Sequence, residues 1–223
     1  MRVVIAGGHG KIALYLERFL ATRGDEPVGL IRDPAQAEDL RDVGAEPVVL
    51  DLEKTGPEAV AKVLTGADAA VFAAGAGPGS GIQRKDTVDR AAAVLFAQAA
   101  EIAGVRRFLQ VSSYGLDRAE DPSLDEVFRA YLKAKAAAEE DLRSRDLDWT
   151  ILRPVQLTDE VATGLVNLDF HVPPGKIPRE EVAAVLVALL DDNDTIGLTL
   201  ELAKGPTPIE IAVDQVTSST RSK

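Results

Sequence analysis

Cysteine is absent from the 223 residues, and histidine occurs only twice, at His9 and His171. Without cysteine the chain can form no disulfide, use no thiolate nucleophile and offer no sulfur ligand to a metal ion. Two imidazoles are too few for the usual kinds of structural zinc site. We therefore predict a protein without a bound metal, whose chemistry rests on other side chains.

Positive charge is also scarce, because 25 Lys and Arg face 36 Asp and Glu, for a formal net charge of −11. This balance opposes binding to nucleic acid or to an anionic membrane, since neutralising phosphates takes clustered cations. No apolar run is long enough to cross a bilayer, and residues 2–6 are too few for the apolar core of a signal peptide. We expect a cytoplasmic protein that binds a small molecule.

What the chain does have is a regular alternation of short apolar runs with stretches of helical spacing. The predicted strands are 3–5, 27–31, 46–50, 68–72, 107–111, 149–152 and 198–202, with a short one inside 161–172. The predicted helices are 11–23, 35–43, 57–64, 88–103, 128–145, 178–190 and a short closing one at 207–213, before an end at 217–223 that we expect to fray.

This order predicts βαβ units and an α/β fold, a Rossmann-like, doubly wound and mainly parallel sheet with helices on both faces. Residues 1–223 then form one domain, because no linker or repeat divides them. Within it, residues from about 155 to 223 would supply a small region on the substrate side.

A glycine-rich turn follows the first predicted strand. The spacing of Gly7, Gly10 and Ala13 is a variant of the dinucleotide-binding fingerprint, with a small third residue for close helix packing. Such a turn, which opens into a helix, offers a pyrophosphate backbone N–H donors and the positive end of a helix dipole. Five later turns also follow predicted strands, and we expect all six at one rim of the sheet; they are the ones at Arg32, Asp51, 75–81, 112–114 and 153–154.

Arg32 ends the second predicted strand, where an NAD-preferring site carries an acid that binds the ribose 2′-hydroxyl. Its planar guanidinium suits a 2′-phosphate, so this position favours NADP, with NAD as the less favoured cofactor. The alternative is an exposed arginine paired with Asp33 or Glu38. Lys11 is either a phosphate ligand or a solvated lysine. Asp51 either reaches the adenine edge or caps the next turn.

The predicted helix 128–145 carries a second set of candidates. Tyr131 and Lys135 lie one turn apart on its apolar face, so hydroxyl and ammonium can converge on one ligand. A nearby lysine favours the phenolate and so makes the tyrosine a usable general acid or base. Ser113 could hydrogen-bond a substrate carbonyl or alcohol. The alternative is that Tyr131 packs at the core edge and Lys135 reaches out to Glu139.

These features together resemble the atypical short-chain dehydrogenase/reductases, specifically their small NAD(P)H-binding, NmrA-like type. The resemblance covers nearly the whole chain. The motifs that carry it are Gly-Gly-His-Gly-Lys-Ile-Ala (7–13), Asp51-Leu52, Ala73-Ala74-Gly75, Val111-Ser112-Ser113, Tyr131-x-x-x-Lys135 and Thr150-Ile151-Leu152-Arg153-Pro154.

The resemblance implies a Rossmann fold that binds NADP(H), with a catalytic set of Ser113, Tyr131 and Lys135. In such enzymes the tyrosine transfers a proton, the lysine holds the ribose and lowers the tyrosine pKa, and the serine orients the substrate. The implied cofactor-binding residues are Gly7, Gly8, His9, Gly10, Lys11, Ile12, Arg32, Asp51, Leu52, Ala73, Ala74, Gly75, Ser112, Lys135, Pro154 and Val155.

Two departures from the family pattern leave alternatives open. The gap between Ser113 and Tyr131 is atypical, so Tyr114 is a second candidate for the proton donor. The region after Pro154 is short, which favours a small substrate or none. We therefore expect an NADP-dependent oxidoreductase acting on a small carbonyl, alcohol or quinone-like compound. The alternatives are an epimerase or dehydratase with a tightly bound cofactor, and an NADP(H) sensor that regulates a protein partner.

Overall fold

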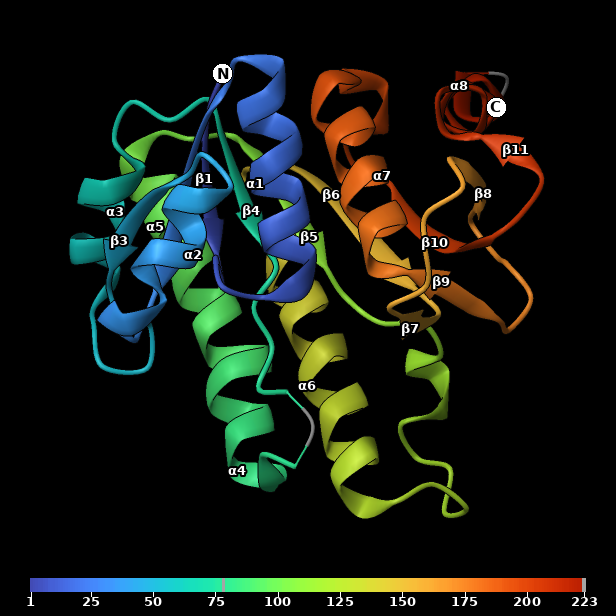
Figure 1. Ribbon diagram of the computed structural model, residues 1–223. Helices are drawn as coiled ribbons and strands as arrows, with labels where there is room; N and C mark the ends of the chain where they lie inside the picture. Colours follow the sequence, from blue (N-terminus) through green and yellow to red (C-terminus); the bar gives the residue numbers. More distant parts are fainter. Residues whose placement is uncertain (78, 222–223) are drawn as a thin grey trace.

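The structure is a computed structural model that describes residues 1–77 and 79–221 (Figure 1). Pro78, within the predicted 75–81 loop, and residues 222–223, within the predicted frayed end, lie outside the described residues. Across the described ranges, no helix combines the length and the apolar character needed to cross a bilayer.

A single large sheet organises the molecule, with nine strands in the order β11-β8-β10-β6-β5-β4-β1-β2-β3. All neighbouring strands pair in parallel except at the β8 edge, where β10 and β11 both pair with β8 in antiparallel fashion. Its strands are β1(Arg2–Ala6), β2(Glu26–Ile31), β3(Glu46–Val49), β4(Ala69–Phe72), β5(Arg107–Val111), β6(Asp148–Pro154), β8(Leu165–Asp169), β10(Thr199–Lys204) and β11(Thr207–Pro208). The predicted Rossmann-like fold, mainly parallel, is confirmed.

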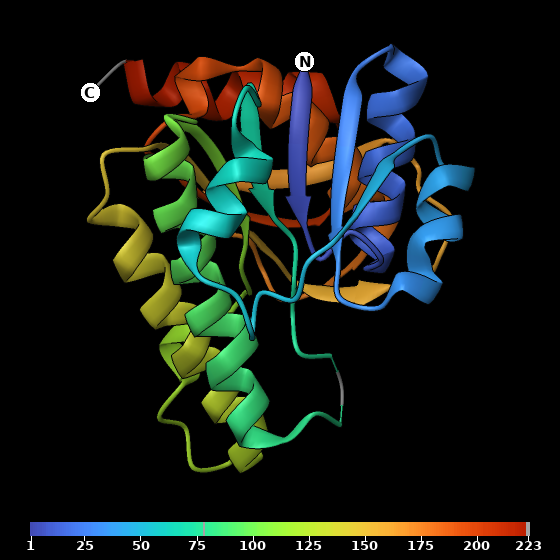
Figure 2. The ribbon, with the colours of Figure 1, turned by 90° about the vertical axis from the view of Figure 1, so that its left-hand side faces the viewer.

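Helices cover both faces of this sheet (Figures 1 and 2). The α-helices are α1(Lys11–Arg23), α2(Ala37–Asp42), α3(Pro57–Leu64), α4(Gly81–Arg84), α5(Ala93–Ala103), α6(Glu126–Arg143), α7(Arg179–Asp191) and α8(Ile209–Arg221). The shorter helical segments are η1(Pro34–Gln36), η2(Lys85–Ala92), η3(Leu116–Arg118) and η4(Asn193–Thr195), of which η2 is a π-helix that joins α4 to α5.

The core has two layers, because the buried strands send alternate side chains to opposite faces. Val3 and Ile5 of β1 join one apolar cluster with residues of α1, α7 and α8. Val4 and Ala6 join the other, with residues of α3, α5 and α6. The run of β-branched and small residues in β1 is therefore apolar without alternation, as a strand covered on both sides requires.

The C-terminal third differs most from the predicted elements. The predicted closing helix exists, but its predicted bounds of 207–213 and the predicted fraying of 217–221 are wrong, since α8 begins at Ile209 and runs to Arg221. It buries Ala212, Val213 and Val216 against the sheet. A small parallel sheet of β7(Gln156–Thr158) and β9(Lys176–Pro178) was not predicted either. Each of its strands has three residues, too short to leave a periodic pattern.

Candidate functional site

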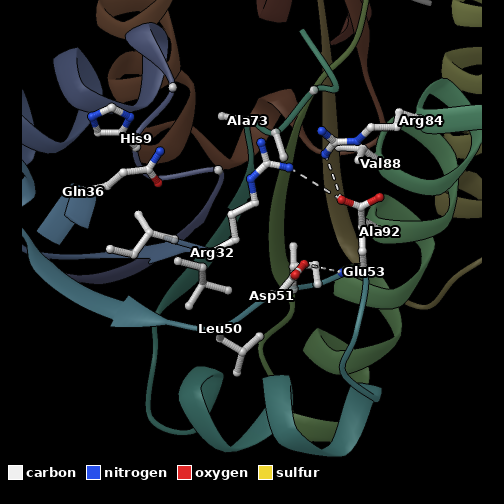
Figure 3. Close-up of a pocket in the computed structure, with 17 residues that line it drawn as sticks. His9, Arg32, Gln36, Leu50, Asp51, Glu53, Ala73, Arg84, Val88 and Ala92 are labelled. Atoms are coloured by element: carbon white, nitrogen blue, oxygen red, sulfur yellow. Dashed lines mark hydrogen bonds and ion pairs between the residues drawn. The ribbon is translucent and has the colours of Figure 1, made fainter. Parts of the chain in front are cut away.

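A cleft of about 240 Å³ opens at the carboxyl ends of β1 to β4 (Figure 3). This is the rim at which the six turns were predicted to gather, and open parallel sheets bind their ligands there. Predicted binding residues that line the cleft are Gly7, His9, Gly10, Arg32, Asp51, Leu52, Ala73, Ala74 and Gly75. Lining residues not predicted are Leu30, Ile31, Gln36, Leu50, Glu53, Arg84, Val88 and Ala92.

The glycine turn has the geometry of an anion cradle. Gly7 has a φ of +83°, and a Cβ there would lie 2.7 Å from the Cα of Ala74, so only glycine lets β1 and β4 approach so closely. Gly10 is the N-cap of α1, and no side chain caps its first turn. The N–H groups at the start of α1 are thus offered to a ligand, together with the positive end of the helix dipole.

Gly8 serves the packing of the turn. Its N–H donates to the carbonyl of Leu30 at 2.9 Å, and a Cβ on it would meet the Cα of Gly29 at 2.8 Å. The neighbouring His9 lines the cleft and pairs through Nε2 with Asp39 Oδ2 at 2.7 Å. Gly8 therefore holds the turn against β2, while His9 contributes a polar wall.

Lys11 extends from the first turn of α1 toward the C-terminal part of the chain. Its Nζ donates to Asp159 Oδ2 at 2.6 Å, and Arg179 donates to the other oxygen of the same carboxylate. These two cations hold the pKa of Asp159 below its usual value. Since Lys11 is largely exposed, a phosphate at the cradle could take it from Asp159.

Asp51 and Arg32 both line the cleft, where each contacts residues of the loop after β3. Asp51 accepts a hydrogen bond from the N–H of Glu53 and pairs with Lys54 at 3.0 Å. Partial burial opposes its ionisation, but these bonds outweigh burial and lower the pKa of Asp51. Arg32 Nη1 lies 3.7 Å from Glu53 Oε2, and the pairing with Asp33 or Glu38 given as the alternative is wrong.

Lys135 is buried next to the cleft, against the backbone of the lining residue Ala74, and is not extended to solvent. Its Nζ donates to the carbonyl of Val111 at 3.1 Å and to that of Ala74 at 3.5 Å, and it lies 3.5 Å from Asp89 Oδ1. The side chains of Lys135 and Asp89 are 5% and 0% exposed, so they form a buried ion pair. The predicted alternative of a Lys135–Glu139 pair is therefore wrong.

Tyr131 lies beside this ion pair. Lys135 Nζ is 5.9 Å from the centre of the Tyr131 ring, and Lys85 Nζ is 5.2 Å from it. Phe128 stacks on the ring at a centroid distance of 5.8 Å. Figures 1 and 2 show α6 extending past the carboxyl edge of the sheet, next to α4 and α5. Tyr131 thus comes from a helix that overhangs the rim.

Glu139, one turn beyond Lys135, has a different role. It accepts a hydrogen bond from Ser112 Oγ at 2.5 Å and binds Arg153 through two bonds of 2.9 and 2.6 Å. The bonds to Glu139 raise the pKa of Arg153. Ser112 is buried and turned toward α6, and its predicted contact with a cofactor would need its backbone or a rearranged hydroxyl.

The other predicted residues follow β5 and β6. Ser113 Oγ donates to the carbonyl of Tyr114 at 3.3 Å, and the N–H of Tyr114 donates to the carbonyl of Pro154 at 3.1 Å. Val155 is buried beside them. Ser113, Tyr114 and Pro154 therefore form one junction between the two strand ends, outside the lining of the described cleft.

Asp89, Glu53 and Arg84 are the site residues that the sequence analysis missed. Asp89 lies in η2, where it pairs with Lys135 and its Oδ2 accepts a hydrogen bond from the N–H of Ala76 at 3.3 Å. No sequence signal singles out Asp89, because η2 also carries the charged residues Lys85, Asp86 and Arg90. Glu53 and Arg84 come from loop and helix ends, where no periodic pattern indicates which way a side chain points.

Comparisons with known proteins agree with this geometry. A family model described as NAD(P)H-binding matches residues 7–193. A Bacillus subtilis protein described as an uncharacterized sugar epimerase is 33% identical over 97% of this chain and 100% of its own length.

Two solved structures are similar along nearly their whole length. A Bacillus halodurans protein described as an NAD-dependent epimerase/dehydratase has a TM-score of 0.90 and 38% identity, over 97% of this chain and 100% of that one. An oxidoreductase from Lactococcus lactis has a TM-score of 0.86 and 28% identity, over 98% and 97% of the two chains. The chain therefore belongs to the NAD(P)H-binding family of atypical, NmrA-like short-chain dehydrogenase/reductases, a family of NAD(P)-dependent oxidoreductases.

Proposed function

We propose that the protein is an NADP-dependent oxidoreductase that moves a hydride between the nicotinamide and a small carbonyl, alcohol or quinone-like compound. The observation that carries this proposal is the cleft, in which Arg32 stands where an NAD-preferring site has an acid. The buried Lys135 beside Tyr131 supports a proton-transfer step next to this cleft.

In this proposal the cradle of Gly7 to Ile12 binds the pyrophosphate, with Lys11 released from Asp159. Asp51 and Leu52 contact the adenine, and the turn Ala73–Gly75 follows the adenosine ribose and its phosphate. Pro154 and Val155 flank the nicotinamide, which supplies or accepts the hydride when bound. Two observations support pyrophosphate binding at this cradle: the first turn of α1 has no side-chain cap, and Gly7 lets the turn lie close to Ala74.

Tyr131 is the proposed proton donor and acceptor, and Ser113 orients the substrate oxygen. Lys135 holds the nicotinamide ribose, but its charge is partly offset by Asp89 at 3.5 Å. A lysine paired with a carboxylate lowers the pKa of a nearby tyrosine less than an unpaired lysine would. We therefore assign Lys135 chiefly to binding and orientation, with the proton transfer left to Tyr131.

A substrate screen that follows the absorbance of NADPH tests the proposal, with carbonyl compounds and quinones as oxidants. For the best substrate we expect Tyr131→Phe to lower kcat about 100-fold or more, because general acid–base catalysis contributes that much. Tyr114→Phe is the matched control, and should change kcat less than twofold while both variants melt like the parent protein. An unchanged rate in Tyr131→Phe would contradict the tyrosine mechanism, and a loss in Tyr114→Phe alone would move the role to Tyr114.

A cofactor-retaining epimerase or dehydratase is the second candidate, favoured by the names of the Bacillus relatives. It predicts that the purified protein carries stoichiometric nucleotide and oxidises no external NADPH. A regulator that senses NADP(H) predicts tight NADP binding without turnover, and a protein partner that dissociates when nucleotide is added.

A further inference from the structure

Two arginines and one glutamate meet at the outer end of the cleft, and each comes from a different element. Arg32 follows β2, Glu53 follows β3, and Arg84 ends α4. Arg84 Nη2 donates to Glu53 Oε2 at 2.8 Å, and Arg32 Nη1 lies 3.7 Å from the same oxygen. Figure 3 shows the two guanidinium groups converging on this carboxylate from opposite walls of the cleft.

Other acids nearby are already bound to groups of their own. Asp33 accepts the N–H of Ala35 at the start of η1, and Asp51 is held by Lys54 and by a backbone N–H. Among the residues that the structure describes, Glu53 is the acidic partner of both Arg32 and Arg84. Both guanidinium groups remain partly open to solvent, at 55% and 34% side-chain exposure.

Glu53 itself is anchored from a third side, because Thr87 Oγ1 donates to its Oε1 at 2.7 Å. One oxygen therefore serves two arginines, although each guanidinium could make a two-pronged bond to an anion. A phosphate monoester offers three oxygens and a charge near −1.5 to −2 at neutral pH, and so satisfies two such forks better than a shared carboxylate does.

We propose that Arg84 is a second binding residue for the 2′-phosphate of NADP, and that Glu53 occupies the place of this phosphate before the cofactor binds. The inference rests on the proposed function, since it assumes the adenosine ribose next to Arg32. Glu53 keeps the two arginines aimed at one point and competes with the incoming phosphate for them. The strength of the preference for NADP over NAD is thus set by three residues, of which Glu53 opposes the preference.

The test uses two fragments of the cofactor, 2′,5′-ADP and 5′-AMP, which differ by the 2′-phosphate and need no redox chemistry. Calorimetric titration of the full-length protein gives the affinity ratio of the two. We expect Arg84→Gln to lower the affinity for 2′,5′-ADP about tenfold and the affinity for 5′-AMP less than twofold. Glu53→Gln removes the competing charge and keeps the shape of the side chain. It should raise the affinity for 2′,5′-ADP several-fold and leave the affinity for 5′-AMP unchanged.

Arg90→Gln is the matched control, because Arg90 is an ion-paired arginine of the adjoining η2 that does not line the cleft. One outcome is that the parent protein prefers 2′,5′-ADP while the ratio of the two affinities stays unchanged in both Arg84→Gln and Glu53→Gln. This result overturns the inference and leaves the proposed NADP preference intact. A parent protein with no preference for 2′,5′-ADP overturns both. A drop in the ratio for Glu53→Gln would make Glu53 a support of the site and overturn its competing role.

Discussion

Glu17 of α1 is a carboxylic acid buried within the fold. Its side chain is fully buried under the glycine turn, and neither carboxyl oxygen has a hydrogen-bond partner among the described residues. Gly8 and Gly29 make the room, since a Cβ on them would lie 3.0 and 2.4 Å from Glu17 Oε1. Burial away from water raises the pKa of Glu17 to about 9, so the folded protein holds this group as a neutral acid at pH 7.

This burial predicts a stability that falls as the pH rises. Below pH 4.5 the carboxyl is protonated in both states; between 4.5 and about 9 only the unfolded chain releases the proton, and folding loses up to about 1.4 kcal/mol per pH unit. Glu17→Gln removes the effect, so its free energy of unfolding relative to the parent should increase by about 4 kcal/mol from pH 5 to pH 8 in urea unfolding. The exposed Glu58→Gln is the control and should follow the parent; parallel curves for Glu17→Gln would show that Glu17 ionises normally.

The position of a site residue can be predicted from the sequence where the backbone conformation requires that residue type. Gly7 and Gly10 lie where their spacing places them, because a glycine turn after a buried strand has few geometries. Glu17 could not be foreseen, since a glutamate in an amphipathic helix is ordinarily solvated. Arg84 and Glu53 could not either, because their approach depends on how three separate elements are placed by the whole fold.

At the scale of elements, the packing of η2 against α6 positions the charged residues beside the cleft-lining residue Ala74. The buried pair of Asp89 and Lys135 joins the two helices and contacts the strand ends through the carbonyls of Ala74 and Val111. A π-helix shifts the side-chain register of a helix, and such segments are frequent at functional sites. The apolar spacing predicts a plain helix from residue 88 to 103, because helical periodicity does not reveal the wider turns of a π-helix.

This pair should be strongly coupled in stability. Lys135→Met and Asp89→Asn each leave a buried charge without its partner, at a cost of about 3–5 kcal/mol. The double variant removes both charges, so its cost should fall at least 1.5 kcal/mol short of the sum, roughly the coupling expected for contacting residues. A urea-unfolding cycle measures this difference. The exposed pair Asp86–Arg90 on η2 gives the control cycle, with an expected coupling below about 1 kcal/mol; equal coupling in both cycles would contradict a buried ion pair.

For the molecule as a whole, one core cluster spans both ends of the chain. The cluster that contains Ile5 and Leu16 also contains Leu186, Val213 and Val216, so the first strand and the last helix bury the same layer. The doubly wound, mainly parallel sheet could be predicted from the βα alternation, because right-handed crossovers leave few arrangements. The antiparallel edge of β8 and β11 could not, since two short strands carry no signal of their partner.

Because this cluster joins β1, which ends at the cleft, to α8, ligand binding at the cleft should stabilise both ends of the described chain. NADP at 100 times its Kd adds about 2.7 kcal/mol, which for a chain of this size raises the Tm by roughly 5–10 °C. Differential scanning calorimetry should show one transition with and without NADP, and a smaller shift with NAD at the same concentration. Two transitions, of which NADP moves only one, would mean that the β8–α8 end unfolds independently of the cofactor-binding strands.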